Sequence, residues 1–216
     1  MIRVCALDFD GVVLESVGVK LEAFRRLFAG HANTPEIVRY LEANNGLDRY
    51  TKFHRIWTEM LGREYGPEVE ARLDADFSAM VLEAVLACPF VPGAEDFLRE
   101  TNLPLYVISA MPLRELKTIV EKRGLAVRFQ GLYGSPGRKA DQLREVINKR
   151  GLSPDEIVFV GDSENDRKAA AESHVPFIGR RNAEEFTPPL PLLLDDLRGL
   201  SAAIARLSAP QAPGKR

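Results

Sequence analysis

The chain has 216 residues, enough for one large domain or for a domain with a smaller one inserted into it. Hydrophobic residues make up 45% of the chain and charged residues 28%, which is typical of a folded globular protein and not of a disordered one. The 29 Lys and Arg residues against 31 Asp and Glu residues give a formal net charge of −2, so no strong charge indicates binding to nucleic acid or to an anionic membrane surface.

Cysteine content and apolar runs indicate the compartment. Cys5 and Cys88 form neither a disulfide framework nor a CxxC motif, and we expect two buried thiols in a reducing environment. The first residues lack the charged and apolar segments of a signal peptide, and no later apolar run is long enough to span a bilayer. We therefore expect a cytoplasmic protein that does not insert into a membrane.

The first predicted element is a short apolar strand over residues 2–7, which is followed by Asp8, Phe9, Asp10 and Gly11. From about residue 16 to residue 86, apolar residues instead recur at helical spacing, with interruptions rich in Gly, Pro and Asn. This segment is predicted to be a block of about four helices. The apolar positions are Val17, Leu21, Phe24 and Phe28, then Tyr50, Phe53, Trp57 and Met60, then Val69, Leu73, Phe77, Met80 and Ala84.

From Pro92 onward, strands and helices alternate in the prediction, as in a parallel sheet with helices on both faces. Residues 128–135 are compatible with a further short strand, and the Pro-rich residues 187–194 are expected to follow the surface. The predicted strands span residues 104–110, 157–160 and 175–179, and the predicted helices span residues 92–101, 111–124, 138–151 and 164–173.

These patterns predict an α/β fold with a Rossmann-like parallel sheet and an inserted all-helical cap. Residues 1–14 and 88–207 would form the α/β core, and residues 15–87 would form the cap. The polar residues 208–216, which contain Pro and Gly, would form a flexible tail.

Polar groups are concentrated after the predicted strands. In open parallel sheets, ligands bind outside the carboxyl ends of the strands, and these ends meet at one edge. Crowded carboxylates raise one another's pKa unless they share a positive partner, and a hard divalent cation such as Mg²⁺ is such a partner. The groups expected at this edge are Asp8, Asp10, Ser109, Arg138, Lys139, Asp162, Glu164 and Asp166.

Four short motifs resemble those of the haloacid dehalogenase superfamily. They are DFDGVV at residues 8–13, VIS at residues 107–109, Lys139, and VGDSEND at residues 160–166. The resemblance covers nearly the whole chain, because the helical block lies where that superfamily inserts its helical cap. The segment NNGLDRYTKF at residues 44–53 is similar to phosphoglycolate-phosphatase-like members, and β-phosphoglucomutase shares the fold, the cap and the two aspartates.

The resemblance implies a phosphoric monoester hydrolase that acts on a small phosphorylated metabolite through an aspartyl-phosphate. Asp8 would be the nucleophile, and Asp10 would protonate the leaving alkoxide and then deprotonate water. An acid at position 10 favours an oxygen leaving group, since dehalogenases of this type lack an acid there. Ser109 would donate a hydrogen bond to a phosphate oxygen.

The resemblance also implies a metal site and a cation. Mg²⁺ would be held by the Asp8 carboxylate, the Asp10 backbone carbonyl and Asp162, with Asp166 acting through water or from outside the coordination sphere. Lys139 would neutralise the phosphoryl group and restrain Asp8. The third motif reads Arg-Lys-Ala here, not Lys-Pro, so Arg138 is the alternative cation, and Lys139 is preferred from its spacing to the fourth motif.

The helical cap should select the substrate. Arg49 and Lys52 flank the apolar stripe of residues 50–60, and they are interpreted either as ligands for an anionic substrate group or as a solvated basic edge. Lys20 is a further candidate. Glycines at positions 131, 134 and 137 suggest a flexible loop that delivers Lys139.

Two other functions stay open at this level. A phosphomutase of the β-phosphoglucomutase type would need a cap group, such as Arg49, to hold the phosphate that is not transferred. A non-catalytic binding protein would not need the complete acidic set. Either a monomer or a homodimer is compatible with the sequence.

Overall fold

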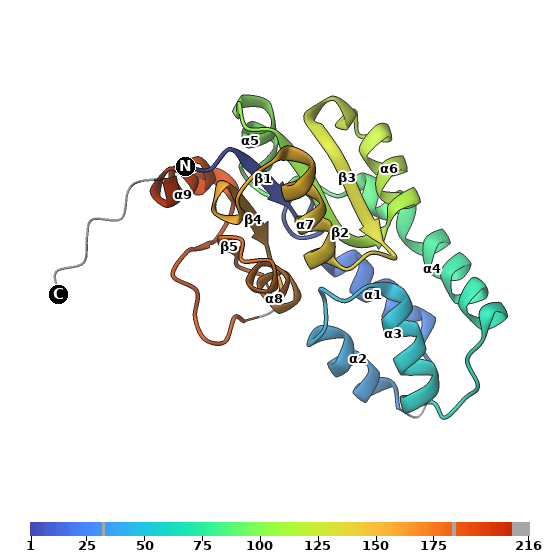
Figure 1. The fold of residues 1–216 in the computed structure, drawn as a ribbon. Coiled ribbons are helices and arrows are strands. Elements are labelled where there is room, and N and C mark those ends of the chain that lie inside the picture. The colour runs from blue at the N-terminus through green and yellow to red at the C-terminus, as the bar shows by residue number, and fades with distance from the viewer. Residues whose placement is uncertain (32, 183–184, 209–216) are drawn as a thin grey trace.

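The computed structural model describes residues 1–31, 33–182 and 185–208, and the described part contains a six-stranded sheet (Figure 1). Each pair of neighbouring strands is parallel, in the order β3-β2-β1-β4-β5-β6. The strands are β1 (Val4–Leu7), β2 (Leu105–Pro112), β3 (Phe129–Ser135), β4 (Ile157–Gly161), β5 (Phe177–Arg180) and β6 (Leu193–Leu194).

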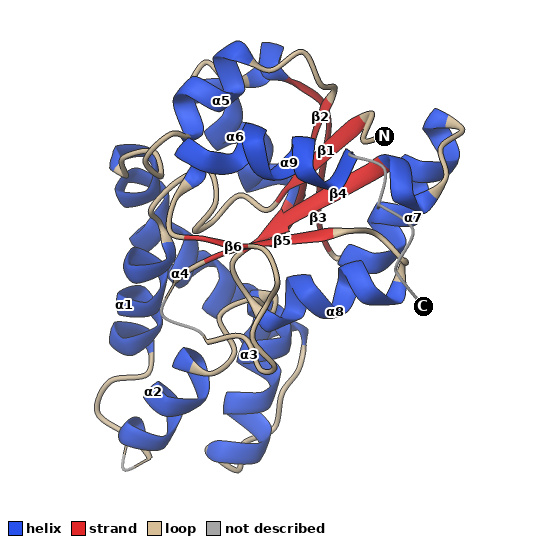
Figure 2. Cartoon of the chain, turned by 90° about the vertical axis from the view of Figure 1, so that its left-hand side faces the viewer, coloured by secondary structure: helices blue, strands red, loops and turns tan. Residues whose placement is uncertain are grey.

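Helices cover both faces of the sheet, as Figure 2 shows. α5 (Ala94–Glu100), α6 (Leu113–Lys122) and α9 (Leu200–Ser208) pack on one face, where their apolar residues share a buried cluster with Cys5 and Leu7. α7 (Lys139–Arg150) and α8 (Glu164–Glu172) pack on the other face against Val4 and Ala6. Alternate residues of β1 therefore serve opposite layers, which is why this strand is apolar throughout.

Between β1 and α5 the chain forms a helical cap, by which we mean helices α1 to α4 and the turns between them. The cap lies beside the carboxyl ends of the strands (Figure 1). Its rings pack as the helical spacing predicts, with the Phe24 ring centroid 4.4 Å from that of Phe77 and 5.7 Å from that of Phe53. The cap helices are α1 (Val17–Leu27), α2 (Thr34–Glu42), α3 (Arg49–Arg55) and α4 (Pro67–Ala87), and the π-helical turn Ile56–Met60 continues α3.

The α/β sheet with an inserted helical cap confirms the predicted fold class. Cys5 and Cys88 are both buried free thiols, as expected. No helix in the described part of the chain is long and apolar enough to cross a membrane. The domain boundaries stay a prediction, and residues 209–216 of the predicted tail lie outside the described residues. In the part of the chain that the structure describes, short 3₁₀ turns span Ala126–Arg128, Pro154–Glu156 and Leu197–Gly199.

One local expectation was wrong. Gly131 and Gly134 are not in a flexible loop but in β3, where a Cβ at Gly134 would lie 2.5 Å from the Met111 carbonyl oxygen. The glycine is needed there for close strand packing, not for mobility. Residues 187–194 are exposed or half-buried, as expected of a segment that follows the surface, and within them Leu193 and Leu194 pair with β5 as the edge strand β6.

Candidate active site

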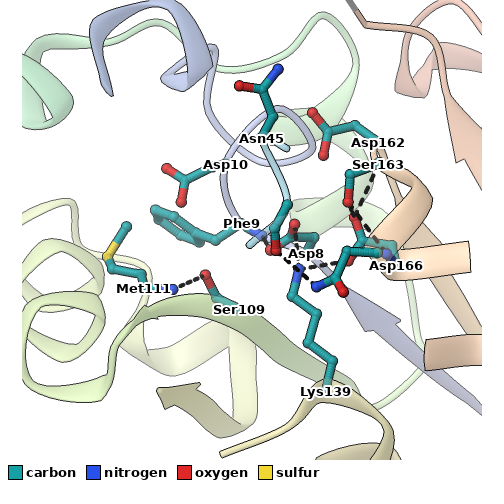
Figure 3. Close-up of polar contacts among 12 residues, drawn as sticks. Asp8, Phe9, Asp10, Asn45, Ser109, Met111, Lys139, Asp162, Ser163 and Asp166 are labelled. Carbon is teal, nitrogen blue, oxygen red and sulfur yellow. Dashed lines mark hydrogen bonds and ion pairs between the residues drawn. The ribbon is translucent and has the colours of Figure 1, made fainter. Parts of the chain in front are cut away.

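Asp8 lies directly after β1, which is paired with β2 on one side and with β4 on the other. Its backbone N–H donates to the Val160 carbonyl oxygen at 2.9 Å, so β4 fixes its position. The side chain is 5% exposed, and its Oδ1 accepts a hydrogen bond from the Phe9 N–H at 2.7 Å. Oδ2 faces the amino group of Lys139 (Figure 3).

Lys139, the first residue of α7, is the cation of the site. Its Nζ donates to Asp8 Oδ2 at 2.8 Å and to Asp166 Oδ1 at 2.5 Å. Burial alone would lower the pKa of Lys139, but Asp166 and Asp8 outweigh it and raise this pKa. The neighbouring Arg138 is exposed, and its guanidinium pairs with Glu172 at 2.6 Å. The structure thus places Lys139, and not Arg138, against Asp8.

Three buried carboxylates form an acidic cluster, which we define as Asp8, Asp162 and Asp166. One oxygen from each lies within 4.8 Å of the others. Burial raises the pKa of Asp8 to about 7, although Lys139 opposes the shift, and repulsion from Asp166 and Asp10 adds to it. Burial and the charges of Asp8 and Asp166 likewise raise the pKa of Asp162. A compact set of oxygen ligands whose negative charge is only partly offset by Lys139 fits a hard divalent cation such as Mg²⁺.

The fourth motif positions Asp166 through the start of α8. Ser163 precedes the helix, and its hydroxyl donates to Asp166 Oδ2 at 2.6 Å, while its backbone N–H donates to the same oxygen at 3.2 Å. The Asp166 backbone N–H in turn donates to the Ser163 hydroxyl oxygen at 3.3 Å, which completes a capping box that fixes the Asp166 carboxylate. The role of Ser163 was not predicted, although the Ser-x-x-Asp spacing is a recognisable sequence signal.

Asp10 lies near Asp8 but points away from Lys139 (Figure 3). Gly11, with φ of +72°, turns the chain directly after it. The Ser16 hydroxyl donates to Asp10 Oδ1 at 2.5 Å, and Lys20 on α1 forms an ion pair with Oδ2. Burial would raise the pKa of Asp10, but Lys20 and Ser16 outweigh it and hold this pKa below its ordinary value.

Ser109 is fully buried in β2, and its Oγ accepts a hydrogen bond from the Met111 N–H at 3.1 Å. Strand pairing is irregular between Ile108 and Pro112, so the chain departs from regular strand geometry just beyond Ser109. This departure gives the backbone at the strand end a bent path. Ser109 therefore lies at the same edge as the acidic cluster, as the strand-end argument requires.

The predicted cap residues are buried, so the solvated basic edge is the wrong interpretation. Arg49 is 5% exposed, and its guanidinium donates to Asp74 at 3.0 Å, to Ser78 at 2.8 Å and to both oxygens of Glu115. Lys52 is 6% exposed, and its Nζ donates to the Asn45 carbonyl oxygen at 2.9 Å.

Two cavities lie between the cap and the strand ends. A small one of about 60 Å³ is bounded by Asp10, by the cap cations Lys20, Arg49 and Lys52, and by apolar side chains of the cap. A larger one of about 850 Å³ opens beside Lys139. The walls of both include Leu47 and Ala110, so the two spaces adjoin. The acid candidate Asp10 and the amino group of Lys139 therefore border adjoining spaces that a small molecule can occupy.

Asn182 was missed by sequence reasoning. It follows β5, and its Nδ2 donates to Asp162 Oδ2 at 2.6 Å. No motif marks this position, because the contact joins residues twenty positions apart through the packing of two strands.

Comparison with known proteins agrees with this geometry. A model of the haloacid dehalogenase-like hydrolase family matches residues 2–174. Phosphoglycolate phosphatase 1 of Pseudomonas aeruginosa is 28% identical, over 92% of this chain and 78% of its own. A phosphoglycolate phosphatase of Shigella boydii is 27% identical, over 82% of this chain and 81% of its own.

The fold is similar to that of several solved structures. β-Phosphoglucomutase from Clostridium difficile superposes with a TM-score of 0.77 at 16% identity, over 96% of this chain and 98% of that one. A predicted phosphoglycolate phosphatase from Haemophilus somnus has a TM-score of 0.73 at 18% identity, over 94% of this chain and 98% of that one. At such identities the likeness concerns the fold alone. The match of the family model over most of the chain shows that the chain belongs to the haloacid dehalogenase-like hydrolase family.

Proposed function

We propose that the protein is an Mg²⁺-dependent phosphatase that hydrolyses a small phosphorylated metabolite through an aspartyl-phosphate on Asp8. The observation that carries this proposal is the buried Lys139 amino group, which lies 2.8 Å from Asp8 within a cluster of three carboxylates. A cation at this distance restrains the Asp8 carboxylate and can neutralise a phosphoryl group that approaches it.

In the first step, an Asp8 carboxylate oxygen attacks phosphorus, and the bond from phosphorus to the ester oxygen breaks. Protonated Asp10 gives its proton to that oxygen, so an alcohol leaves and Asp8 carries the phosphoryl group. The Lys20 ion pair favours the ionised form of Asp10, so this pair must loosen before Asp10 acts as an acid.

In the second step, the Asp10 carboxylate takes a proton from water, and the water oxygen attacks phosphorus. The bond between phosphorus and the Asp8 oxygen breaks, which releases inorganic phosphate and restores the Asp8 carboxylate. Lys20 and Ser16 hold Asp10 in the ionised form that this second step needs. The Ser109 hydroxyl would donate a hydrogen bond to a phosphate oxygen.

Mg²⁺ would be held by the carboxylates of Asp8 and Asp162 and by the Asp10 backbone carbonyl, with Asp166 kept outside by its contacts to Lys139 and Ser163. When bound, the ion supplies positive charge for the phosphate oxygens. The oxygen-only ligands and the raised pKa of Asp8 and Asp162 support this assignment.

A substrate panel tests the function. Purified protein with Mg²⁺ should release inorganic phosphate from at least one small phosphate monoester, including phosphoglycolate, and from p-nitrophenyl phosphate. The relatives named above motivate the inclusion of phosphoglycolate. Failure on the whole panel would refute the proposal.

The same panel separates a phosphatase from a phosphomutase. A mutase would convert a sugar phosphate to its isomer with little free phosphate. The Arg49 guanidinium, which we considered for holding a second phosphate, already contacts Glu115, Asp74 and Ser78. Because these contacts engage the Arg49 guanidinium, they favour hydrolysis over the return of the phosphoryl group to another position of a sugar phosphate.

A further inference from the structure

Asn182, in the chain segment after β5, contacts the acidic cluster. β5 ends at Arg180, and the Asn182 amide nitrogen donates to Asp162 Oδ2 at 2.6 Å. Asp162 itself follows β4, the strand that pairs with β5 in parallel. The family model matches residues 2–174, so Asn182 lies beyond the matched segment.

The contact is tightly enclosed. Gly11 lies against both partners, and a Cβ added there would come within 2.0 Å of Asp162 Oδ2 and within 2.8 Å of Asn182 Nδ2. Asp162 is 6% exposed, so solvent offers its carboxylate few competing hydrogen bonds. The turn after β1 and the end of β5 therefore hold the Asp162 carboxylate from two sides.

We propose that Asn182 is a positioning residue that fixes the Asp162 carboxylate for Mg²⁺ binding. Its amide hydrogen bond occupies Oδ2 and sets the rotation of the carboxylate, which leaves Oδ1 available to the ion. Groups of this kind around a metal site typically change metal affinity by about 10- to 100-fold when they are removed. The proposal rests on the proposed function, because it assigns the metal to Asp162.

The residue that precedes Asn182 supplies a control. Arg181 and Asn182 are adjacent in sequence, but the Arg181 guanidinium is exposed and pairs with Asp195 at 2.8 Å. Arg181→Ala therefore alters the same segment without touching Asp162. Asn182→Leu keeps the approximate size of the side chain and removes the hydrogen-bond donor, while Asn182→Ala removes both.

The measurement is isothermal titration of Mg²⁺ into the full chain without substrate, followed by the Mg²⁺ dependence of phosphate release. Asn182→Leu and Asn182→Ala should bind Mg²⁺ about 10-fold or more weakly than the natural protein. At saturating Mg²⁺ their kcat should approach the natural value, whereas Arg181→Ala should match the natural protein throughout. Thermal unfolding confirms that each variant is folded before titration.

A third variant separates hydrogen-bond donation from direct ligation. Asn182→Asp replaces the donor by an acceptor, so it should bind Mg²⁺ as weakly as Asn182→Ala. Tighter binding by Asn182→Asp would overturn the proposal, because it would make residue 182 a ligand. Natural affinity in both Asn182→Leu and Asn182→Ala would overturn it as well. If the natural protein binds no Mg²⁺, the metal assignment in the proposed function fails along with this one.

Discussion

Arg138 and Lys139 are adjacent cations whose surroundings differ completely. The Lys139 side chain is 3% exposed and contacts two buried carboxylates, whereas the Arg138 side chain is 67% exposed and pairs with Glu172 at the surface. Burial strengthens an ion pair in electrostatic terms and makes the loss of one partner costly, while surface pairs are screened by water. The position at which α7 begins therefore determines that Lys139, and not Arg138, faces the buried carboxylates.

Substitutions at Lys139 and Arg138 form a matched test of which cation the site uses. Lys139→Met should abolish phosphate release and lower the free energy of unfolding by about 3–5 kcal/mol, because it removes the positive charge that pairs with two buried carboxylates. Arg138→Ala should retain activity and stability near the natural values. Urea unfolding and phosphate release measure both effects, and an inactive Arg138→Ala beside an active Lys139→Met would reverse the assignment.

The residues of the site differed in how far the sequence could predict them. Asp8, Asp10, Ser109, Lys139 and Asp162 follow predicted strands or begin a helix, so local pattern and family motifs suffice to select them. The Asn182 contact depends on how the segment after β5 packs against Asp162, which no local pattern encodes.

At the scale of elements, Arg49 joins the cap to the core. It begins α3, and its guanidinium contacts both carboxylate oxygens of Glu115 on α6 and one oxygen of Asp74 on α4. A second contact joins the same part of the cap to α8, where the Asn165 amide donates to the Gly46 carbonyl oxygen at 2.8 Å. The segment from Gly46 to Arg49 is therefore anchored to helices on both faces of the sheet.

Removing the core partner tests this connection. Glu115→Ala should lower the free energy of unfolding by about 2–3 kcal/mol, less than the loss of a whole buried ion pair, because Asp74 still partners Arg49. Arg114→Ala is the control, since the exposed Arg114 guanidinium also pairs with Asp74 and should matter little. Urea unfolding compares them, and equal stabilities would show that the Arg49–Glu115 pair contributes nothing.

The elements themselves were largely predictable, because apolar periodicity distinguishes the cap helices from the buried strands. β6 was not predicted, since two residues in a Pro-rich segment carry no periodicity and pair through backbone groups alone. The π-helical turn after α3 was not predicted either, because a short π-helical turn and an α-helix fit the same apolar pattern.

At the scale of the whole molecule, the acidic cluster lowers the folding stability of the protein, although the proposed function needs these carboxylates. Asp8 and Asp162 have raised pKa values, so their ionised forms are disfavoured in the folded state relative to the unfolded chain. A cation that binds only the folded protein should offset this cost. The site is therefore expected to link metal binding to folding stability.

Thermal unfolding measures this linkage. Mg²⁺ should raise the melting temperature, and at about a hundredfold excess over its Kd the stabilisation should reach about 2.7 kcal/mol. Asp162→Asn should be more stable than the natural protein in EDTA, because one repelling charge is gone, and should lose the Mg²⁺ response. A natural protein that is indifferent to Mg²⁺ would contradict the metal assignment.

In the proposed mechanism, Asp8 becomes covalently phosphorylated and Asp10 is needed to release the phosphate. p-Nitrophenolate leaves without protonation, so Asp10→Asn should still transfer the phosphoryl group from p-nitrophenyl phosphate but hydrolyse the intermediate slowly. Acid quenching and peptide mass spectrometry of Asp10→Asn with Mg²⁺ and this substrate should therefore find one phosphoryl group on Asp8. A phosphoryl group on another residue, or phosphate release that persists in Asp8→Asn, would contradict the account.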